Sequence, residues 1–143
     1  DIMASLGLGQ LKRYDGILAR RKEIIEMYDR ALKDKYADVL VHFGTDFASS
    51  GHLYATRAYG MRESDRNAAI VKMAENGVAA NVHYKPLPMH TAYKAFGFDI
   101  ADYPNAYAQY ANEITLPLHT LLDDEDVDYV IRTYIDAIKE IKK

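Results

Sequence analysis

The stretch NVHYKPLPMHTAYK, residues 81–94, carries the side chains best suited to binding chemistry. Two histidines, His83 and His90, lie seven residues apart, with Tyr84, Lys85 and two prolines between them. Histidine, tyrosine and lysine side chains can hydrogen-bond hydroxyls and anions. One interpretation is a site that binds and orients a polar ligand. The other is a surface turn with ordinary polar side chains, and the residues alone leave both open.

A predicted strand at residues 78–84, VAANVHY, would position part of this stretch. Successive side chains of a strand point to opposite faces, so Asn81, His83 and Lys85 would share one face. The prolines that follow cannot donate to a strand ladder, so they end the strand and hold the path to His90 extended. A short helix is expected to begin near His90, which would bring polar groups from three elements around one concave place.

Other kinds of chemistry lack a sequence signal. The chain has no cysteine, and therefore no thiolate and no disulfide framework. It has no GxSxG elbow, no Walker phosphate loop and no GxGxxG fingerprint. Its five histidines do not show the spacing of a zinc site, so we expect no metal. The acidic run DDED, residues 123–126, is typical of a solvated helix start.

Three arginines and one further histidine have structural interpretations that we favour over functional ones. Arg57, Arg62 and Arg66 surround a predicted turn and could bind a carboxylate or phosphate. We expect instead a solvated, charged turn. His52 precedes an apolar and aromatic strand, so we expect it to be buried and hydrogen-bonded.

Length and composition indicate one domain spanning residues 1–143. The net charge is −3, from 18 basic and 21 acidic residues, so there is no basic field for nucleic acid. No apolar run approaches the roughly 20 residues of a membrane span. The first residues have the pattern of the middle of a helix, which suggests a piece cut from a longer protein.

The periodicity predicts one long helix followed by strands and helices, in an α+β layer structure. Gly7 and Gly9 near its start indicate either close approach of another backbone or a bent helix start. Strands are expected at 39–43, 52–59 and 78–84, with a short extended run at 114–119. Further helices are expected at 63–77, 90–97 and 102–113, and a closing helix follows the DDED run.

Four segments resemble one enzyme family in the same order along the chain. The long helix IMASLGLGQLKRYDGILARRKEIIEMYDRAL resembles a family helix with the pattern A..G..QL, and SSGHLYATRAY is similar to its HLY strand. ENGVAANVHYKPLPMHTAYK resembles GI…VHY.PLH…Y, and ITLPLHTLLDDEDVDYVI resembles SLPL…L…EV.YVI. The chain therefore resembles the C-terminal part of the DegT/DnrJ/EryC1/StrS sugar aminotransferases, which are pyridoxal-phosphate enzymes of fold type I.

The resemblance implies a fold and an activity. The fold is a small C-terminal domain with a long N-terminal helix and a small, mainly antiparallel sheet with helices packed on it. A full-length relative moves an amino group, commonly from glutamate, to a keto group of a nucleotide-linked sugar. The implied enzyme is a cytoplasmic homodimer used in polysaccharide or modified-sugar biosynthesis, with no nucleic acid or membrane as partner.

The family's Schiff-base lysine lies in a large N-terminal domain, outside this chain. We therefore expect this chain alone to be inactive, to bind no pyridoxal phosphate and to hold no catalytic residue. Carried over by position, His83, Tyr84 and His90 would contact the nucleotide-sugar by hydrogen bonding. Because KPLPMH inserts two residues where many relatives read PLH, the family's contact histidine could be either one. The alternative function is a stand-alone, non-catalytic α+β module for binding, regulation or dimerisation.

Overall fold

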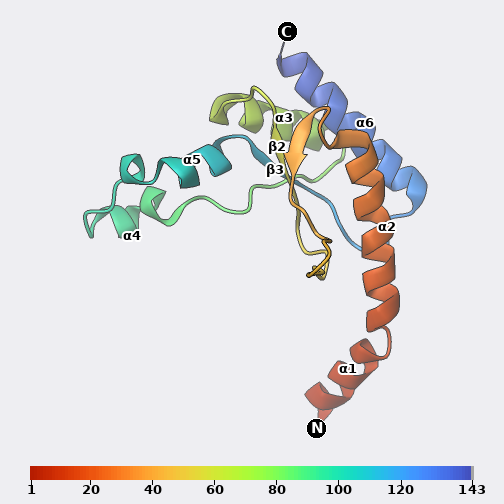
Figure 1. The fold of residues 1–143 in the computed structure, drawn as a ribbon. Helices are drawn as coiled ribbons and strands as arrows, with labels where there is room; N and C mark the ends of the chain where they lie inside the picture. The colour runs from red at the N-terminus through yellow and green to blue at the C-terminus, as the bar shows by residue number, and fades with distance from the viewer. Residues whose placement is uncertain (143) are drawn as a thin grey trace.

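The computed structural model describes residues 1–142 as an α+β structure (Figure 1). The helices and strands largely follow the order that the sequence predicts, but the predicted long N-terminal helix is two helices, α1 and α2. The elements are α1 (Ile2–Leu11), α2 (Tyr14–Leu32), β1 (Ala37–Val39), β2 (Tyr54–Ala58), α3 (Glu63–Glu75), η1 (Leu87–Met89), α4 (Thr91–Lys94), η2 (Ile100–Asp102), α5 (Pro104–Ala111), β3 (Glu113–Leu116) and α6 (Asp124–Ile141).

The sheet is small and antiparallel, with the order β1-β2-β3. Along the central strand β2, Tyr54, Thr56 and Ala58 are buried while the residues between them are partly exposed. This alternation follows from the period of two of a strand, and it gives the sheet one face turned to the core. Helices α2, α3 and α6 contact one another or the sheet and supply the rest of the core.

The closing helix α6 shows how the sequence determines the packing. Asp123 and Asp126 form a reciprocal capping box at its start, which satisfies two otherwise unpaired backbone donors. Its buried side chains recur every three or four residues and include Val127, Tyr134 and Ile138. One face of the helix therefore lies against α2 and α3, as the predicted stripe requires.

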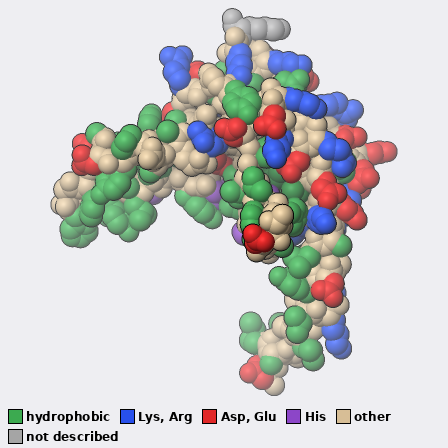
Figure 2. Space-filling view, in the orientation of Figure 1, with side chains coloured by type: hydrophobic (Ala, Val, Ile, Leu, Met, Phe, Trp, Pro, Cys, Tyr) green, Lys and Arg blue, Asp and Glu red, His purple; other side chains and the backbone are tan. Residues whose placement is uncertain are grey.

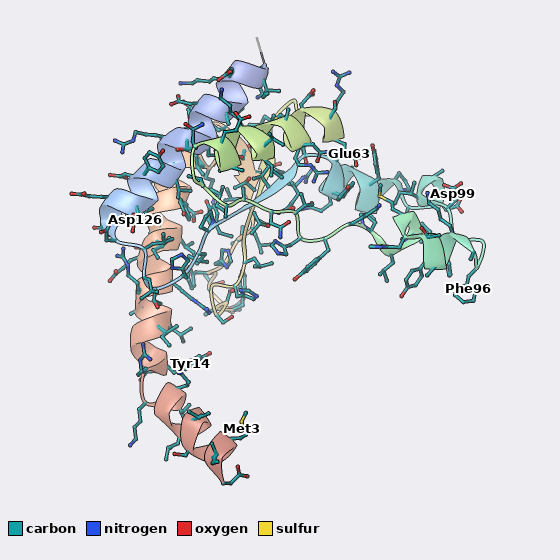
Figure 3. The ribbon with its side chains drawn as sticks, turned by 180° about the vertical axis from the view of Figure 1, so that it is seen from behind. Met3, Tyr14, Glu63, Phe96, Asp99 and Asp126 are labelled. Carbon is teal, nitrogen blue, oxygen red and sulfur yellow. The ribbon has the colours of Figure 1, made fainter. Side chains whose placement is uncertain are left out.

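The N-terminal helix is broken at Lys12 and Arg13, between α1 and α2. Only α2 packs on the core, and α1 extends away from it with no buried residue (Figure 1). Apolar side chains remain exposed along α1, among them Met3 at its far end (Figure 3). Among residues 1–142, no atom outside the adjoining residues and backbone of α1 lies within 4 Å of where a Cβ on Gly7 or Gly9 would be. The expected close approach of another backbone at these glycines is therefore not made by the described part of this chain.

Two predicted strands are wrong in extent. The strand expected at 39–43 is β1, which ends at Val39, and the chain then forms a loop closed by a 2.8 Å hydrogen bond from Ser49 N to His42 O. In the segment 78–84 only Asn81 forms a bridge, to Thr115. The ladder stops there because side chains take the next two backbone donors, as described below.

Residues 86–111, here called the arm, stand out from the core (Figure 1). They hold η1, α4, η2 and α5, and Phe96 and Asp99 lie toward its tip (Figure 3). Gly97, with a positive φ of 86°, follows the last turn after α4, as its place in the sequence predicts. Within residues 1–142, no helix combines the length and apolarity needed to cross a membrane.

Candidate functional site

His83 and Tyr84 lie together where the chain leaves the sheet for the arm. Their rings meet edge to face, with centroids 4.7 Å apart and planes at 87°. The Tyr84 side chain is 74% exposed, whereas His83 is half-buried. The Nδ1 atom of His83 is buried and has no hydrogen-bond partner within the described residues. The pair therefore presents a polar imidazole beside an open aromatic face.

His90 returns toward the same segment because η1 folds the intervening residues into a tight turn. Its Nε2 atom lies 3.3 Å from the carbonyl oxygen of Lys85, and its backbone N–H donates to Leu87 O at 3.0 Å. The predicted shared strand face of Asn81, His83 and Lys85 does not form, since this segment is not a strand. The described contacts join His83 to Tyr84 and His90 to Lys85, but not one histidine to the other.

Glu113, at the start of β3, fixes the backbone of this site. Its side chain is buried, with 2% of the residue exposed, and its Oε2 accepts the His83 N–H at 2.9 Å. The Thr115 hydroxyl donates to its Oε1. Burial raises the pKa of the Glu113 carboxyl above its usual range, while the bonds from Thr115 and His83 oppose this. The sequence does not single out this residue, because Glu113 ends the helix predicted at 102–113 and precedes the extended run predicted at 114–119, whereas the structure places it in β3.

The three arginines near the predicted turn have different environments. Arg62 is exposed and forms a capping box with Asp65 at the start of α3. Arg66 is 1% exposed, which contradicts the expected solvated turn. Its Nη1 donates to the carbonyl oxygens of Tyr110 and Glu113 at 3.2 and 3.3 Å, and its guanidinium lies 4.5 Å from the Tyr110 ring centre. Arg66 therefore attaches the last turn of α5 to α3 and β3.

The expectation for His52 is also wrong, because His52 is exposed and His42 is the buried histidine. His42 is 2% exposed and its Nδ1 lies 3.1 Å from Ser49 Oγ. Its ring stacks on Tyr54, with centroids 6.1 Å apart. Burial lowers the pKa of the His42 imidazole, while nearby Asp29 opposes this. His42 thus stabilises the loop between β1 and β2.

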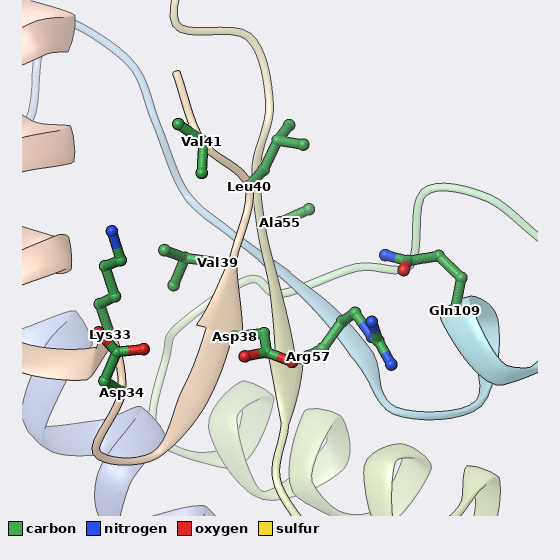
Figure 4. A pocket seen from close by; sticks show the side chains of 9 residues that line it. All are labelled: Lys33, Asp34, Asp38, Val39, Leu40, Val41, Ala55, Arg57 and Gln109. Atoms are coloured by element: carbon green, nitrogen blue, oxygen red, sulfur yellow. The ribbon is translucent and has the colours of Figure 1, made fainter. Parts of the chain in front are cut away.

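Among the surface hollows, one lies over the sheet and another lies in the arm. The first, of about 550 Å³, lies over β1 and β2 and is lined by side chains that include Lys33, Asp34, Asp38, Arg57 and Gln109 (Figure 4). Arg57 Nε is buried there without a hydrogen-bond partner among the described residues. Because two acidic and two basic side chains line the hollow, its charges balance and it does not select an anion.

The second hollow, of about 390 Å³, is in the arm. It is lined by apolar and aromatic side chains: Pro86, Leu87, Pro88, Tyr93, Phe98, Tyr103 and Ala106. Figure 2 shows hydrophobic side chains gathered over the arm. This hollow offers apolar contact to a ligand, and none of His83, Tyr84 and His90 is among the residues that line it.

The described residues do not fit a pyridoxal-phosphate site. Such a site needs an enclosed lysine amine that can form a Schiff base. Each lysine among residues 1–142 is exposed except Lys72, whose Nζ lies 3.2 Å from Glu140 Oε1. No group of three or more potential metal ligands gathers anywhere in this part of the chain either. The arrangement at His83, Tyr84 and His90 can bind and orient a polar ligand.

The chain is similar to sugar aminotransferases over its whole length. Putative sugar aminotransferase Spr1654 from Streptococcus pneumoniae, solved in apo, PMP and PLP forms, is 51% identical. Its apo form superposes with a TM-score of 0.96 over 99% of this chain and 36% of that chain. Helicobacter pylori PseC, an aminotransferase involved in the biosynthesis of pseudoaminic acid, is 30% identical with a TM-score of 0.86, over 97% of this chain and 37% of its own.

A curated relative points the same way. Spore coat polysaccharide biosynthesis protein SpsC from Bacillus subtilis is 34% identical over 97% of this chain and 36% of its own length. The chain thus spans about 36% of the length of such relatives. The family model for DegT/DnrJ/EryC1/StrS aminotransferases matches residues 1–134. The chain belongs to the DegT/DnrJ/EryC1/StrS aminotransferase family.

Proposed function

We propose that this chain is the small C-terminal domain of a pyridoxal-phosphate-dependent sugar aminotransferase. The enzyme would transfer an amino group from glutamate to the keto group of a nucleotide-linked sugar. The observation that carries the proposal is the His83–Tyr84–His90 segment, with an exposed Tyr84 ring and a His83 Nδ1 that has no partner among the described residues, on a domain that superposes on sugar aminotransferases. One relative, from H. pylori, is named as a transaminase for a UDP-linked sugar, which supports this substrate class.

The residues of this chain bind and orient the substrate in the proposed enzyme. The exposed Tyr84 ring offers an apolar face to a sugar ring, and its hydroxyl can donate to or accept from a sugar hydroxyl. The imidazoles of His83 and His90 can do the same. In this proposal, the cofactor and its lysine belong to a part of the enzyme outside this chain. The proposed enzyme acts in the cytoplasm.

Helix α1 supports the proposal of a larger assembly. It exposes apolar side chains all around, at Ile2, Met3, Leu6, Leu8 and Leu11. A helix that is apolar on every side is typical of a helix buried in a core. We therefore propose that the remainder of the enzyme, or the second subunit of a homodimer, covers α1.

The test separates the two half-reactions of the full-length enzyme. In the first, glutamate converts the bound cofactor to its pyridoxamine form, which absorbance detects; in the second, the nucleotide-sugar is aminated. His83→Ala, Tyr84→Phe and His90→Ala are expected to weaken the sugar half-reaction and leave cofactor binding and the glutamate half-reaction nearly intact. The control is His52→Ala, at an exposed histidine. Unchanged sugar kinetics in all three variants would overturn the proposed substrate contact.

A separate measurement tests whether this chain alone is inactive. The isolated 143-residue chain is mixed with pyridoxal phosphate and scanned for an internal-aldimine absorbance band. We expect no stoichiometric band, because the lysines of residues 1–142 are exposed or paired. A stoichiometric band that a substrate amine reverses would contradict this expectation.

A further inference from the structure

Glu113 is a buried carboxylate without an ion-pair partner. It is 2% exposed, and no salt bridge within residues 1–142 includes its side chain. Burying a carboxylate is unfavourable unless hydrogen bonds or a charge compensate for the lost hydration. The buried residues on the opposite, core-facing side of β3, Ile114 and Leu116, are apolar and carry no such cost. Core stability alone therefore does not explain a glutamate at this place.

The carboxylate holds one backbone atom of the candidate site. Its Oε2 accepts the His83 N–H at 2.9 Å, and its Oε1 is occupied by the Thr115 hydroxyl. Thr115 also pairs with Asn81 through two backbone hydrogen bonds, of 3.2 and 2.8 Å. The segment is thus attached to β3 at Asn81 and again at His83. After His83 it leaves the sheet, so the second attachment is the last one before Tyr84.

We infer that Glu113 is a positioning residue, which fixes the backbone of His83 so that the His83 imidazole and the Tyr84 ring meet the sugar substrate. This inference rests on the proposed function, since it concerns the same substrate. Glu113 does not itself reach the ligand; it acts through the backbone of His83. Thr115 orients the carboxylate by occupying the oxygen that does not hold His83.

Three substitutions separate positioning from a general structural role. Glu113→Gln keeps a side-chain oxygen that can accept the His83 N–H. Glu113→Asp keeps the charge but is one methylene shorter, which withdraws the acceptor by about 1.5 Å. Glu113→Ala removes the acceptor and leaves a buried N–H without a partner. Glu75→Ala, an exposed glutamate at the end of α3, is the matched control.

The experiment measures both half-reactions of the full-length enzyme by stopped-flow absorbance of the cofactor. Glu113→Ala and Glu113→Asp are expected to lower kcat/KM for the nucleotide-sugar by about tenfold to a hundredfold. The glutamate half-reaction should stay within about twofold of the wild type, a pattern that a general loss of structure would not produce. Glu113→Gln should restore most of the sugar half-reaction. Glu75→Ala should match the wild type in both.

Two results would overturn the inference. One is a sugar half-reaction in Glu113→Asp and Glu113→Ala that equals the Glu75→Ala control. The other is an equal loss in both half-reactions, which would indicate a structural role. If Glu113→Ala does not fold, Glu113→Asp decides the question alone. A loss in His83→Ala without a loss in Glu113→Asp leaves the proposed function in place and removes only the positioning role. Unchanged sugar kinetics in Glu113→Asp and in all three of His83→Ala, Tyr84→Phe and His90→Ala would remove the proposed substrate contact too.

Discussion

Replacing Arg66 by alanine should destabilise the chain far more than an ordinary charge removal. The substitution deletes the donor to two carbonyl oxygens, those of Tyr110 and Glu113. The buried Glu113 carbonyl oxygen then has no donor, which costs about 1–3 kcal/mol, whereas the Tyr110 carbonyl oxygen keeps the backbone N–H of Asn112. The substitution also removes a buried charge, and with it the free-energy cost of keeping that charge away from water, which offsets part of the loss. This cost is only weakly compensated in the wild type, because the Glu63 carboxylate oxygen is 3.9 Å from the guanidinium. We expect a net loss of about 2 kcal/mol in the free energy of unfolding.

Urea unfolding of the 143-residue chain, followed by circular dichroism, measures this loss. The control is Arg62→Ala, whose side chain is 85% exposed and should change the stability by no more than about 0.5 kcal/mol. Arg66→Lys should give an intermediate value, because one ammonium group cannot reproduce the fork that reaches both carbonyls. If Arg66→Ala were within about 1 kcal/mol of Arg62→Ala, the attachment of α5 through Arg66 would be refuted.

The remaining predictions concern a pH dependence, a core hydrogen bond and the exposed helix. Because the pKa of His42 is lowered in the folded chain, the unfolded chain binds the proton more readily. The contribution of His42 to the free energy of unfolding is therefore fully present above about pH 6.5 and decreases as the pH drops below it. His42→Gln should reduce this slope in urea titrations from pH 5 to 8, and His52→Gln should not. Tyr134→Phe removes the 2.9 Å bond to Thr56 and should cost about 1 kcal/mol; a double-mutant cycle with Thr56→Val should show coupling of similar size, and additivity would contradict the bond. Leu6→Glu should leave the melting temperature of the isolated chain unchanged, because Leu6 is exposed there, but lower that of the full-length enzyme. An unchanged melting temperature of the full-length enzyme would contradict the proposal that α1 is covered.

The sequence predicts the core elements well because their signals are local. The stripe of α6 and its acidic start need only the residues of that helix, and both are confirmed. The alternation of β2 is likewise visible in its own five residues. The break at Lys12 and Arg13 has no such signal, since neither glycine nor proline stands there. The apolar stripe continues across it, from Leu11 to Tyr14 and Leu18, so the pattern predicts one unbroken helix.

Residues 78–84 do not form the predicted strand, because side chains bind backbone donors that a strand ladder would use. Their alternation satisfies the pattern of a strand, but a strand also needs a partner for each backbone donor. Asn81 uses its own side chain to accept the Val82 N–H at 2.8 Å, and Glu113, 30 residues away, accepts the His83 N–H. Side chains therefore replace the ladder at the place where the site begins.

The difference between local sequence signals and contacts between distant residues also explains which site residues the sequence could reveal. His83, Tyr84 and His90 are conspicuous because their types and spacing suggest ligand binding, although their contact with substrate stays a prediction. Glu113 and Arg66 are conspicuous only in three dimensions. Both are charged residues inside the core, and each holds backbone atoms that flank the arm: Glu113 at its start, through His83, and Arg66 at its end, through the carbonyl of Tyr110. Buried charged side chains therefore fix both ends of the arm, and a substitution at either should alter the arm's placement before it unfolds the sheet.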